Sequence, residues 1–318
     1  MNALNVSESP TVFDLNAWTT WQLARVEQAL SGWVAVSTDA PMADGVRGLE
    51  TAMRYAVLDG GKRLRPLLVL AACEAVNGDE RAAVRAACAV ELIHAYSLVH
   101  DDMPCMDDDV LRRGKPTVHV QFGQAVALLA GDALQALAFE ILTPEGQDIA
   151  PAMQARLCRL LAQAAGYQGM AGGQAIDLAS VGLPLTSPEL HDMHRLKTGA
   201  LLQASVMMGA ACGSVSPQVE NALKQYGAAV GLAFQVVDDV LDVTADSATL
   251  GKTAGKDAAQ DKPTFVSLLG LQVAQDYANQ LLAQALNSVS SIVSLETQDL
   301  PRTAALQALA RLLVQRTH

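Results

Sequence analysis

Two short acidic segments carry the residue types most able to do chemistry in this chain. The first, residues 100–117, reads HDDMPCMDDDVLRRGKPT and places five aspartates within nine residues, followed at once by Arg112 and Arg113. Crowded carboxylates suit a hard cation, and Mg²⁺ takes oxygen ligands while keeping the phosphate groups of a substrate as partners. The two guanidinium groups suit phosphate oxygens. The segment therefore indicates a magnesium site that binds a phosphorylated ligand.

The second acidic segment, residues 234–242, reads FQVVDDVLD. Asp238 and Asp242 are four residues apart, so they share one face of a helix, with Gln235 and Asp239 on or beside that face. The apolar residues between them are expected to point toward a core. Two acidic helix faces that are far apart in sequence could face each other across a cavity in a helical bundle. Such a cavity would hold metal-bound phosphate between them.

The elements that position these segments are predicted to be helices. The chain has 318 residues, of which 51% are hydrophobic, 17% charged and only 4% aromatic, and Ala and Leu dominate. This composition favours helix over sheet. Helical spacing is predicted over residues 13–36, 50–58, 67–76, 82–100, 118–142, 152–179, 191–212 and 217–243, and again from 265 to the end.

Polar loops are predicted at residues 181–188 and 246–264, where Gly and Pro or Gly and Lys collect. No alternating β pattern, fixed repeat or linker divides the chain. We therefore predict a single all-α domain spanning residues 1–318, a bundle of ten or more helices around a central cavity. Residues 1–11 are expected to be flexible.

The charge and cysteine content exclude several classes of protein. A net charge of −11 argues against nucleic acid as a partner. The five cysteines form no CxxC pair, which is typical of small buried residues in a reducing compartment. The N-terminal residues are too polar for a signal peptide. The longest apolar stretch, residues 125–142, is interrupted by Asp132 and Glu140, so no membrane span is predicted. We expect a cytoplasmic protein.

Seven motifs together resemble those of the trans-isoprenyl diphosphate synthases, and most of all the bacterial farnesyl diphosphate synthases. The resemblance extends from about residue 46 to the C-terminus, and it implies the isoprenoid synthase fold. The motifs are GGKRLRP, HAYSLVHDDMPCMDDDVLRRGKPTVH, LAGDAL, GGQAIDL, HRLKTGAL, GLAFQVVDDVLD and LGKTAGKDAAQDKPTF. One acidic motif alone would be weak evidence, whereas two in this order, with the basic motifs around them, are highly specific.

By this resemblance, the two acidic segments bind Mg²⁺, which holds the diphosphate of an allylic substrate. A diphosphate leaves readily only when metal ions and hydrogen-bond donors neutralise the departing charge. Asp238 is expected to be the main metal ligand of the second segment, with Asp239 and Asp242 acting through water. The implied metal-binding residues are Asp101, Asp102, Asp107, Asp238, Asp239 and Asp242.

The resemblance also implies two diphosphate sites. Isopentenyl diphosphate binds without metal and so needs protein cations, for which the implied residues are Lys62, Arg65, His94 and Arg113. His94 lies seven residues before Asp101, which places both on nearly the same side of a helix. The allylic diphosphate is expected to contact Arg112, Lys197, Lys252 and Lys262. Lys197, Thr198 and Gln235 are expected to line the allylic carbocation, with Gln174 and Asp177 supporting the site.

The implied reaction is a prenyl transfer. Departure of diphosphate leaves an allylic cation, the double bond of isopentenyl diphosphate attacks it, and loss of a proton gives a chain five carbons longer. In the bacterial farnesyl type, an aromatic residue five positions before the first Asp limits product length, and Tyr96 fits this. On an ideal helix, however, Ser97 lies nearer the Asp101 face. A fifteen-carbon product is expected.

Four alternatives remain beside this interpretation. A geranylgeranyl diphosphate synthase would share the chemistry and differ in pocket depth. A class I terpene cyclase would carry an Asn/Asp-Ser/Thr-Glu pattern where this chain has DDVLD. A non-catalytic partner subunit of a prenyl synthase could dispense with its aspartates, yet both sets are present. A di-iron bundle would need two Glu-x-x-His pairs, and only Glu91 with His94 comes near that pattern. The family is usually homodimeric, so we expect a homodimer.

Overall fold

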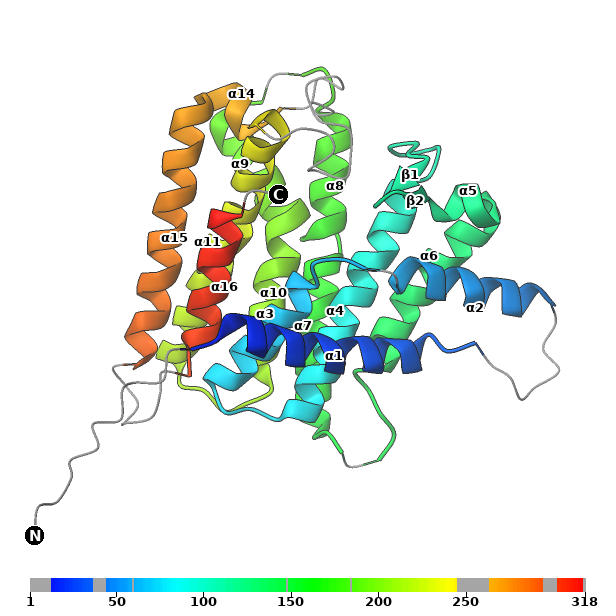
Figure 1. Ribbon diagram of the computed structural model, residues 1–318, viewed down its shortest axis with the longest axis horizontal. Coiled ribbons are helices and arrows are strands. Elements are labelled where there is room, and N and C mark those ends of the chain that lie inside the picture. The colour runs from blue at the N-terminus through cyan, green and yellow to red at the C-terminus, as the bar shows by residue number, and fades with distance from the viewer. Residues whose placement is uncertain are drawn as a thin grey trace, which may run out of the picture.

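The computed structural model describes residues 13–36, 44–58, 60–146, 148–183, 185–244, 263–293 and 302–316. Within these residues it is a bundle of helices with one short hairpin (Figure 1), which confirms the predicted all-α class. The elements are α1 Leu15–Trp33, α2 Asp44–Val57, α3 Leu64–Ala75, α4 Glu80–Asp101, β1 Leu111–Arg112, β2 Lys115–Pro116, α5 Val118–Phe122, α6 Gln124–Glu140, α7 Pro151–Ala165, α8 Met170–Ala179, α9 Ser187–His194, the π-helix η1 Arg195–Gly199, α10 Ala200–Ala211, α11 Pro217–Thr244, α14 Phe265–Leu269, α15 Leu271–Val293 and α16 Ala304–Gln315.

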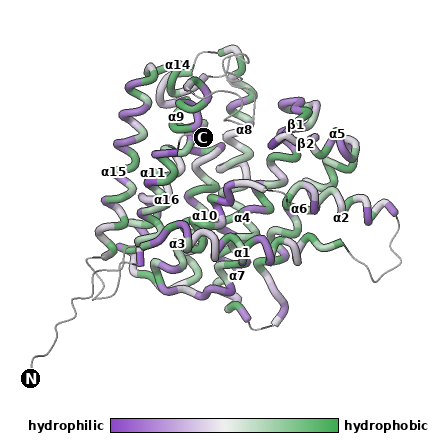
Figure 2. Tube along the Cα trace, viewed as in Figure 1, coloured by the Kyte–Doolittle hydropathy of each residue, from purple (hydrophilic) through white to green (hydrophobic). Residues whose placement is uncertain are grey.

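The two helices that carry the acidic segments, α4 and α11, both pack against α10. Helix α10 is buried along most of its length, and it contributes to both large apolar cores, one with α3, α11, α15 and α16 and the other with α1, α3, α4, α6 and α7. Figure 2 shows polar and apolar residues alternating along the outer helix α15, as expected for a helix with one face on the core. Helices α4 and α11 end at the same end of the bundle (Figure 1), so the fold brings the acidic segments to one region.

The long helix α4 begins at Asp79, whose carboxylate accepts hydrogen bonds from the backbone N–H groups of Arg81 and Ala82. By length and composition α4 is apolar enough to cross a membrane, but 72% of its most apolar window is buried inside the structure. This burial is typical of a core helix. The apolar stretch at residues 125–142 covers most of α6, which at 17 residues is shorter than α4.

Several helix boundaries differ from those predicted. Residues 118–142 form two helices, α5 and α6, because Gly123 has a φ of 87° and interrupts the hydrogen-bond ladder. Residues 152–179 also form two helices, since the chain turns at Gly166 and Gly169 between α7 and α8. The hairpin of β1 and β2 was not predicted at all, because strands of two residues are too short to show an alternating pattern. The predicted loop at residues 246–264 lies outside the described residues except for its last two positions. Residues 1–11, which were predicted to be flexible, lie wholly outside them. That the whole chain forms one domain stays a prediction.

The close packing of α10 on α3 depends on Gly209. A Cβ at this position would lie 2.2 Å from the carbonyl oxygen of Val69 and 2.8 Å from the Cβ of Ala72. We expect Gly209→Ala to lower the free energy of unfolding by about 1–3 kcal/mol, because backbone atoms of α3 must move. Gly48→Ala is the matched control, since Gly48 is also helical but has no atom within 4 Å of its Cβ position, and it should stabilise by about 0.5–1 kcal/mol. Urea unfolding measures both, and equal effects would contradict the packing argument.

Candidate active site

The first acidic segment folds back on the end of α4. The backbone N–H of Asp107 donates to the carbonyl of Asp101 at 2.9 Å, and that of Asp109 donates to the carbonyl of Asp102 at 3.2 Å. Asp108 turns the chain with a φ of 49°, a conformation that Asp tolerates better than most residues. The turn therefore returns the second half of the segment to the helix end, so that Asp107 lies beside Asp101.

The carboxyl group of Asp101 lies in an environment that disfavours its own charge. Its pKa is raised to about 6, chiefly by burial, with the carboxylates of Asp107 and Asp102 adding to the shift and the cations of Lys197 and Arg112 opposing it. A buried carboxylate with like charges beside it gains most from a bound cation. This is the electrostatic signature of a site that binds metal.

Asp102 is held by Arg112. The guanidinium Nε donates to both carboxylate oxygens at 2.9 Å, and Nη2 donates to Oδ1 at 2.6 Å. The Asp102 side chain is only 3% exposed, and burial raises its pKa even though Arg112 lowers it. Asp102 is therefore placed to position Arg112 at the end of α4, and it would coordinate metal only by exchanging these bonds.

The three carboxylates of the second acidic segment differ in burial. Asp238 is 37% exposed, whereas Asp239 and Asp242 are buried. Both oxygens of Asp239 accept hydrogen bonds from the protein, one from Gln235 Nε2 at 2.8 Å and one from the backbone N–H of Phe265 at 2.8 Å. Asp239 thus fixes the start of α14 to α11. Of the three carboxylates, Asp238 is the most exposed.

Lys197 and Thr198 lie on η1, a single π-helical turn between α9 and α10. Such turns are rare and often occur at functional sites. Lys197 Nζ donates to Asp177 on α8 at 2.5 Å, and a Cβ at Gly173 would lie 2.1 Å from the Lys197 backbone nitrogen. The glycine thus lets α8 approach η1 closely enough for Asp177 to reach the lysine.

A chain of hydrogen bonds fixes the polar groups beside Lys197. Thr198 Oγ1 donates to Gln235 Oε1 at 2.9 Å, and Gln235 Nε2 donates to Asp239 at 2.8 Å. Because a carboxylate only accepts, the amide nitrogen of Gln235 faces Asp239 and its carbonyl oxygen faces Thr198. The orientation of both dipoles is thus set before any ligand arrives.

Groups on η1 and α9 lie within electrostatic range of the two acidic segments. The charge of Lys197 acts on Asp101 of the first segment, while the buried His194 on α9 feels both Lys197 and Asp238 of the second. The pKa of His194 is lowered to about 4 by burial, with Asp177 and Asp238 opposing the shift. Lys197 is therefore the cation between the segments. That Asp101 and Asp238 face one shared cavity stays a prediction.

A separate group of cations collects at the start of α3. Arg65 is buried, which lowers its pKa to about 10, and its Nε–H has no hydrogen-bond partner in the described part of the chain. His94 has its pKa lowered by burial and then by the charges of Arg65 and Arg113. The pKa of Lys62 is lowered by burial and by Arg316, although Asp238 opposes the shift. Arg65 and Arg113 are like charges that both act on His94, an arrangement that favours a bound anion, whereas Lys62 is exposed. That these four residues bind isopentenyl diphosphate stays a prediction.

Tyr96 packs against the apolar core between α4, α6 and α7, and its ring meets that of His100 edge-on with centroids 5.7 Å apart. His100 Nε2 lies 3.1 Å from the carbonyl oxygen of Leu128 on α6, where Gly131 leaves room for the imidazole. The Ser97 hydroxyl instead donates to the carbonyl of His94 at 2.9 Å, within its own helix. Tyr96 is thus the bulky group between α4 and its neighbours.

Three residues at the site escaped the sequence analysis or were left without a role. Arg316, after α16, donates from Nη2 to the carbonyl of Phe234 at 3.2 Å and lies 3.5 Å from Asp238 Oδ1. Asp177 is the partner of Lys197, and Arg63 is buried beside the cation cluster. Only Asp177 had a signal in the sequence, the GGQAIDL motif. Two predicted residues, Lys252 and Lys262, lie outside the described residues.

The carboxylates present fit magnesium. Among the residues that the structure describes, no three His, Cys, Asp or Glu side chains are close enough together to hold one ion by themselves. Mg²⁺ commonly binds through one or two carboxylates together with substrate phosphates and water, and it prefers hard oxygen donors. Asp101, Asp107 and Asp238 offer such donors from two sides. The donor set therefore suits ions that arrive with a diphosphate.

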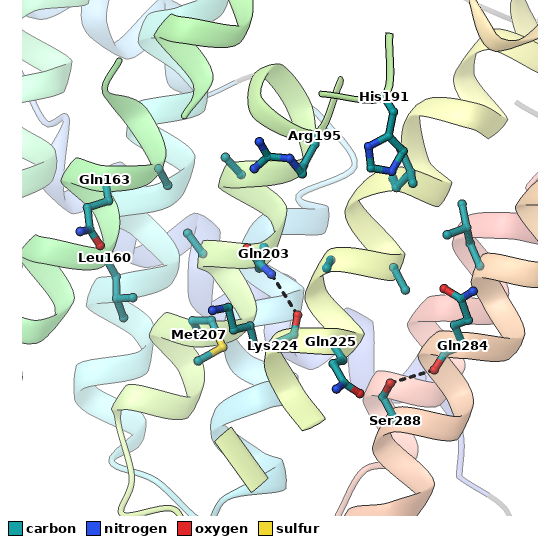
Figure 3. A pocket seen from close by; sticks show the side chains of 18 of the residues that line it. Leu160, Gln163, His191, Arg195, Gln203, Met207, Lys224, Gln225, Gln284 and Ser288 are labelled. Carbon is teal, nitrogen blue, oxygen red and sulfur yellow. Dashed lines mark hydrogen bonds between the residues drawn. The ribbon is translucent and has the colours of Figure 1, made fainter. Parts of the chain in front are cut away.

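A cavity of about 1180 Å³ opens next to η1, and none of the described residues predicted for the site lines it. Its floor is α10 and α11 and its sides are α7 and α15 (Figure 3), with Arg195 and His191 at the η1 end. Gln203 crosses the floor, donating to the carbonyl of Lys224 at 3.0 Å. The cavity is large, but Asp101, Asp238 and the predicted arginines do not line it.

Comparisons with known proteins agree with this geometry. Residues 46–296 match the family model described as Polyprenyl synthetase. A probable farnesyl diphosphate synthase from Sinorhizobium fredii is 48% identical over 86% of this chain and 82% of its own length. The heterodimeric geranylgeranyl pyrophosphate synthase large subunit 1 of Arabidopsis thaliana is 42% identical over 96% of this chain and 81% of its own length.

Two solved structures have the same fold. An FPP/GFPP synthase from Zymomonas mobilis in its apo form has a TM-score of 0.81 at 42% identity, covering 94% of this chain and 98% of the other. A geranyltransferase from Helicobacter pylori, complexed with magnesium and isoprenyl diphosphate, has a TM-score of 0.78 at 33% identity, covering 96% and 97%. The match spans most of the chain in both sequence and fold, and the chain belongs to the polyprenyl synthetase family.

Proposed function

We propose that the chain condenses isopentenyl diphosphate with dimethylallyl diphosphate to give geranyl diphosphate, and a further isopentenyl diphosphate with geranyl diphosphate to give farnesyl diphosphate, releasing one diphosphate and one proton in each condensation. The proposal rests on the presence of two different kinds of candidate diphosphate site, one built from carboxylates and one from cationic side chains. Around Asp101 and Asp238 the groups are carboxylates, which need metal to bind a diphosphate. Around Arg65 the charged groups are arginines and a lysine, which bind a diphosphate directly, and His94 beside them is neutral near pH 7 because its pKa is lowered well below 6.5.

The chain's own residues have distinct tasks in this reaction. Lys197 and Arg112 contact the allylic diphosphate, and Asp177 holds the Lys197 ammonium in place. Thr198 and Gln235 present oxygen dipoles to the carbocation, held by Asp239. Arg65, Lys62, His94 and Arg113 hold isopentenyl diphosphate so that its double bond faces the cation. Magnesium, when bound, supplies the positive charge that stabilises the departing diphosphate.

The experiment that tests the proposal is incubation with isopentenyl diphosphate and either dimethylallyl or geranyl diphosphate, with Mg²⁺ and then with EDTA. We expect farnesyl diphosphate as the main product and loss of activity with the chelator. Activity that persists fully in EDTA, or no prenyl product from either allylic substrate, would refute the proposal.

Product length is proposed to depend on Tyr96. Replacing Tyr96 by Ala removes the bulky ring between α4 and its neighbours, so we expect the main product to lengthen from fifteen to twenty carbons or more. Chromatography of the dephosphorylated products measures this. Tyr167→Ala is the control, because Tyr167 is 82% exposed, and it should leave the product unchanged. An unaltered fifteen-carbon product from Tyr96→Ala would remove the residue from this role.

A geranylgeranyl diphosphate synthase is the second candidate, favoured by the names of the plant relatives and by the mixed product name of the Zymomonas mobilis structure. The chain length of the wild-type product separates the two functions.

We also propose that the protein is a cytoplasmic homodimer. Size-exclusion chromatography with light scattering tests its oligomeric state. A plant relative is named as one subunit of a heterodimer, so a monomer that gains activity only with a second chain would favour that alternative.

A further inference from the structure

Arg63 lies between two of the cations proposed to hold isopentenyl diphosphate, Lys62 and Arg65, at the point where the chain enters α3. Its φ is 45°, in the left-handed region that costs free energy for a residue with a side chain. Lys62 is exposed, yet Arg63 is only 4% exposed. Something must therefore hold a strained and buried arginine at this position.

The Arg63 side chain is anchored by three elements. Its Nε donates to Glu27 on α1 at 2.6 Å, and its Nη1 donates to Glu91 on α4 at 2.7 Å. Its Nη2 donates to the carbonyl of Val57, the last residue of α2, at 2.7 Å, and lies 3.3 Å from Glu27. We call Arg63, Glu27, Glu91 and the Val57 carbonyl the Arg63 anchor. It fastens the turn before α3 to three different helices.

The Arg63 anchor leaves its own cation unavailable to a substrate. Glu27 and Glu91 together offset more than the single charge of Arg63, and every bond is made within the protein. Arg65, two residues later, keeps a buried Nε–H without a partner among the described residues. The two arginines therefore differ in kind, because Arg63 is already satisfied whereas Arg65 is open to a bound anion.

A second contact restrains the same turn on the N-terminal side of Lys62. Arg113 Nη1 donates to the carbonyl of Gly60 at 2.5 Å, and its guanidinium lies 3.0 Å from the Cβ position of Gly61. Gly61 has a φ of 127°, so this close approach and this backbone both require glycine. With Gly60 held by Arg113 and Arg63 held by its anchor, Lys62 is left between two fixed points.

We propose that Arg63 is a positioning residue for isopentenyl diphosphate, acting through the Arg63 anchor to hold Lys62 and Arg65 at the spacing of one diphosphate. The inference rests on the proposed function of that cation cluster. A preorganised site avoids the entropy cost of ordering two long cationic side chains when the ligand arrives. The geometry also requires the arginine fork, since a lysine ammonium offers its donors from one point and cannot reach three helices at once.

The test uses variants that weaken the anchor without touching the proposed substrate ligands. Glu27→Gln removes one charge of the anchor, and because the Glu27 side chain is 42% exposed the protein should stay folded. We expect its Kd for isopentenyl diphosphate, measured by titration calorimetry in EDTA, to rise about tenfold, as for loss of one charged hydrogen bond. Arg63→Lys should raise it by about tenfold or more. The KM for geranyl diphosphate and the kcat with both substrates saturating should stay within about twofold of wild type.

The matched control is Glu80→Gln. Glu80 also accepts a hydrogen bond from an arginine across α1 and α4, from Arg25 Nη2 at 3.1 Å, but it is 72% exposed and outside the Arg63 anchor. This variant should leave all of these constants unchanged. A Glu27→Gln protein that is folded and binds isopentenyl diphosphate as wild type does would overturn the inference. Equal losses of affinity for isopentenyl and geranyl diphosphate would also overturn it, because a purely structural defect would weaken the binding of both substrates alike.

Failure of the inference can be told apart from failure of the proposed function. If the wild-type protein neither binds nor consumes isopentenyl diphosphate, the proposed function is wrong, and the inference falls with it. If the wild-type protein binds it and the two anchor variants bind it equally well, only the role of Arg63 is refuted. If both anchor variants bind isopentenyl diphosphate more weakly while their KM for geranyl diphosphate and the control variant are unaffected, the result supports the proposed function and the role of Arg63.

Discussion

Replacing Asp101 by Asn is expected to lower kcat for prenyl transfer by about a thousandfold while making the protein more stable. The loss of activity follows because Asp101 is the buried carboxylate beside Asp107 and Lys197, where the metal-bound diphosphate is proposed to lie. The gain in stability follows from the same environment. Folding raises the pKa of Asp101 from 3.8 to about 6, so at pH 7 the folded state holds an unfavourable charge.

The sign of the stability change depends on pH. Because the folded pKa is the higher one, this group favours folding when it is protonated, below about pH 4, and that contribution is lost as pH rises through about 6. At pH 7 we expect Asp101→Asn to raise the free energy of unfolding by about 1–2 kcal/mol after allowing for solvent screening. The difference should shrink at acidic pH.

Urea unfolding without metal at pH 7 and at acidic pH measures this contribution, and steady-state assays measure the activity. Asp276→Asn is the control, because Asp276 is exposed on α15 and should affect neither property. A variant that retains activity, or one that loses activity and stability together, would contradict the assignment of Asp101 as a carboxylate held for a bound cation.

Arg112→Ala should cause a large loss of stability together with loss of activity. Arg112 supplies three hydrogen bonds to Asp102, whose side chain is 3% exposed, so its removal leaves a buried carboxylate without that cation. Breaking a buried ion pair in this way is costly. Because Arg112 itself is 34% exposed and water could partly replace it, we expect a loss of about 2–4 kcal/mol in the free energy of unfolding.

A double-mutant cycle separates the ion pair from other effects of Arg112. The double variant Arg112→Ala with Asp102→Asn should lose clearly less than the sum of the two single variants, since it leaves no unpaired buried charge. Arg81→Ala is the control, because its ion pair with Asp148 is at 3.9 Å and Arg81 is 80% exposed, so it should change stability by less than about 0.5 kcal/mol. Additive losses in the cycle would contradict the proposed coupling.

The sequence predicted the parts of the structure whose patterns are local. Asp238 and Asp242 lie on one helix with their apolar neighbours Val237 and Leu241 buried, as their spacing indicates. Asp101 lies at the end of a long buried helix for the same reason. Helical spacing and bundle architecture suggested that the two acidic segments could face each other, and the resemblance to a known family made this a specific prediction. Spacing alone does not say which helix ends share a cavity.

The features that the sequence did not reveal depend on contacts between distant segments. Nothing in HRLKTGAL distinguishes a π-helical turn from an α-helix, because the turn is held by Asp177 and by the close approach at Gly173. Arg63 looked like one of several basic residues in KRLR, and its burial becomes apparent only when Glu27 and Glu91 are in place. Arg316 gave no signal, since its partners lie 78 and 82 residues away.

The hairpin of β1 and β2 has a consequence for how the two substrates influence each other. Its two-residue turn consists of Arg113 and Gly114, both with positive φ, and Arg112 immediately precedes it. Arg112 bonds Asp102 on the allylic side, while its neighbour bonds Gly60 on the isopentenyl side. One peptide bond therefore joins the two sites. Binding of one substrate should therefore change the affinity for the other, and this coupling would arise from the turn without any large rearrangement.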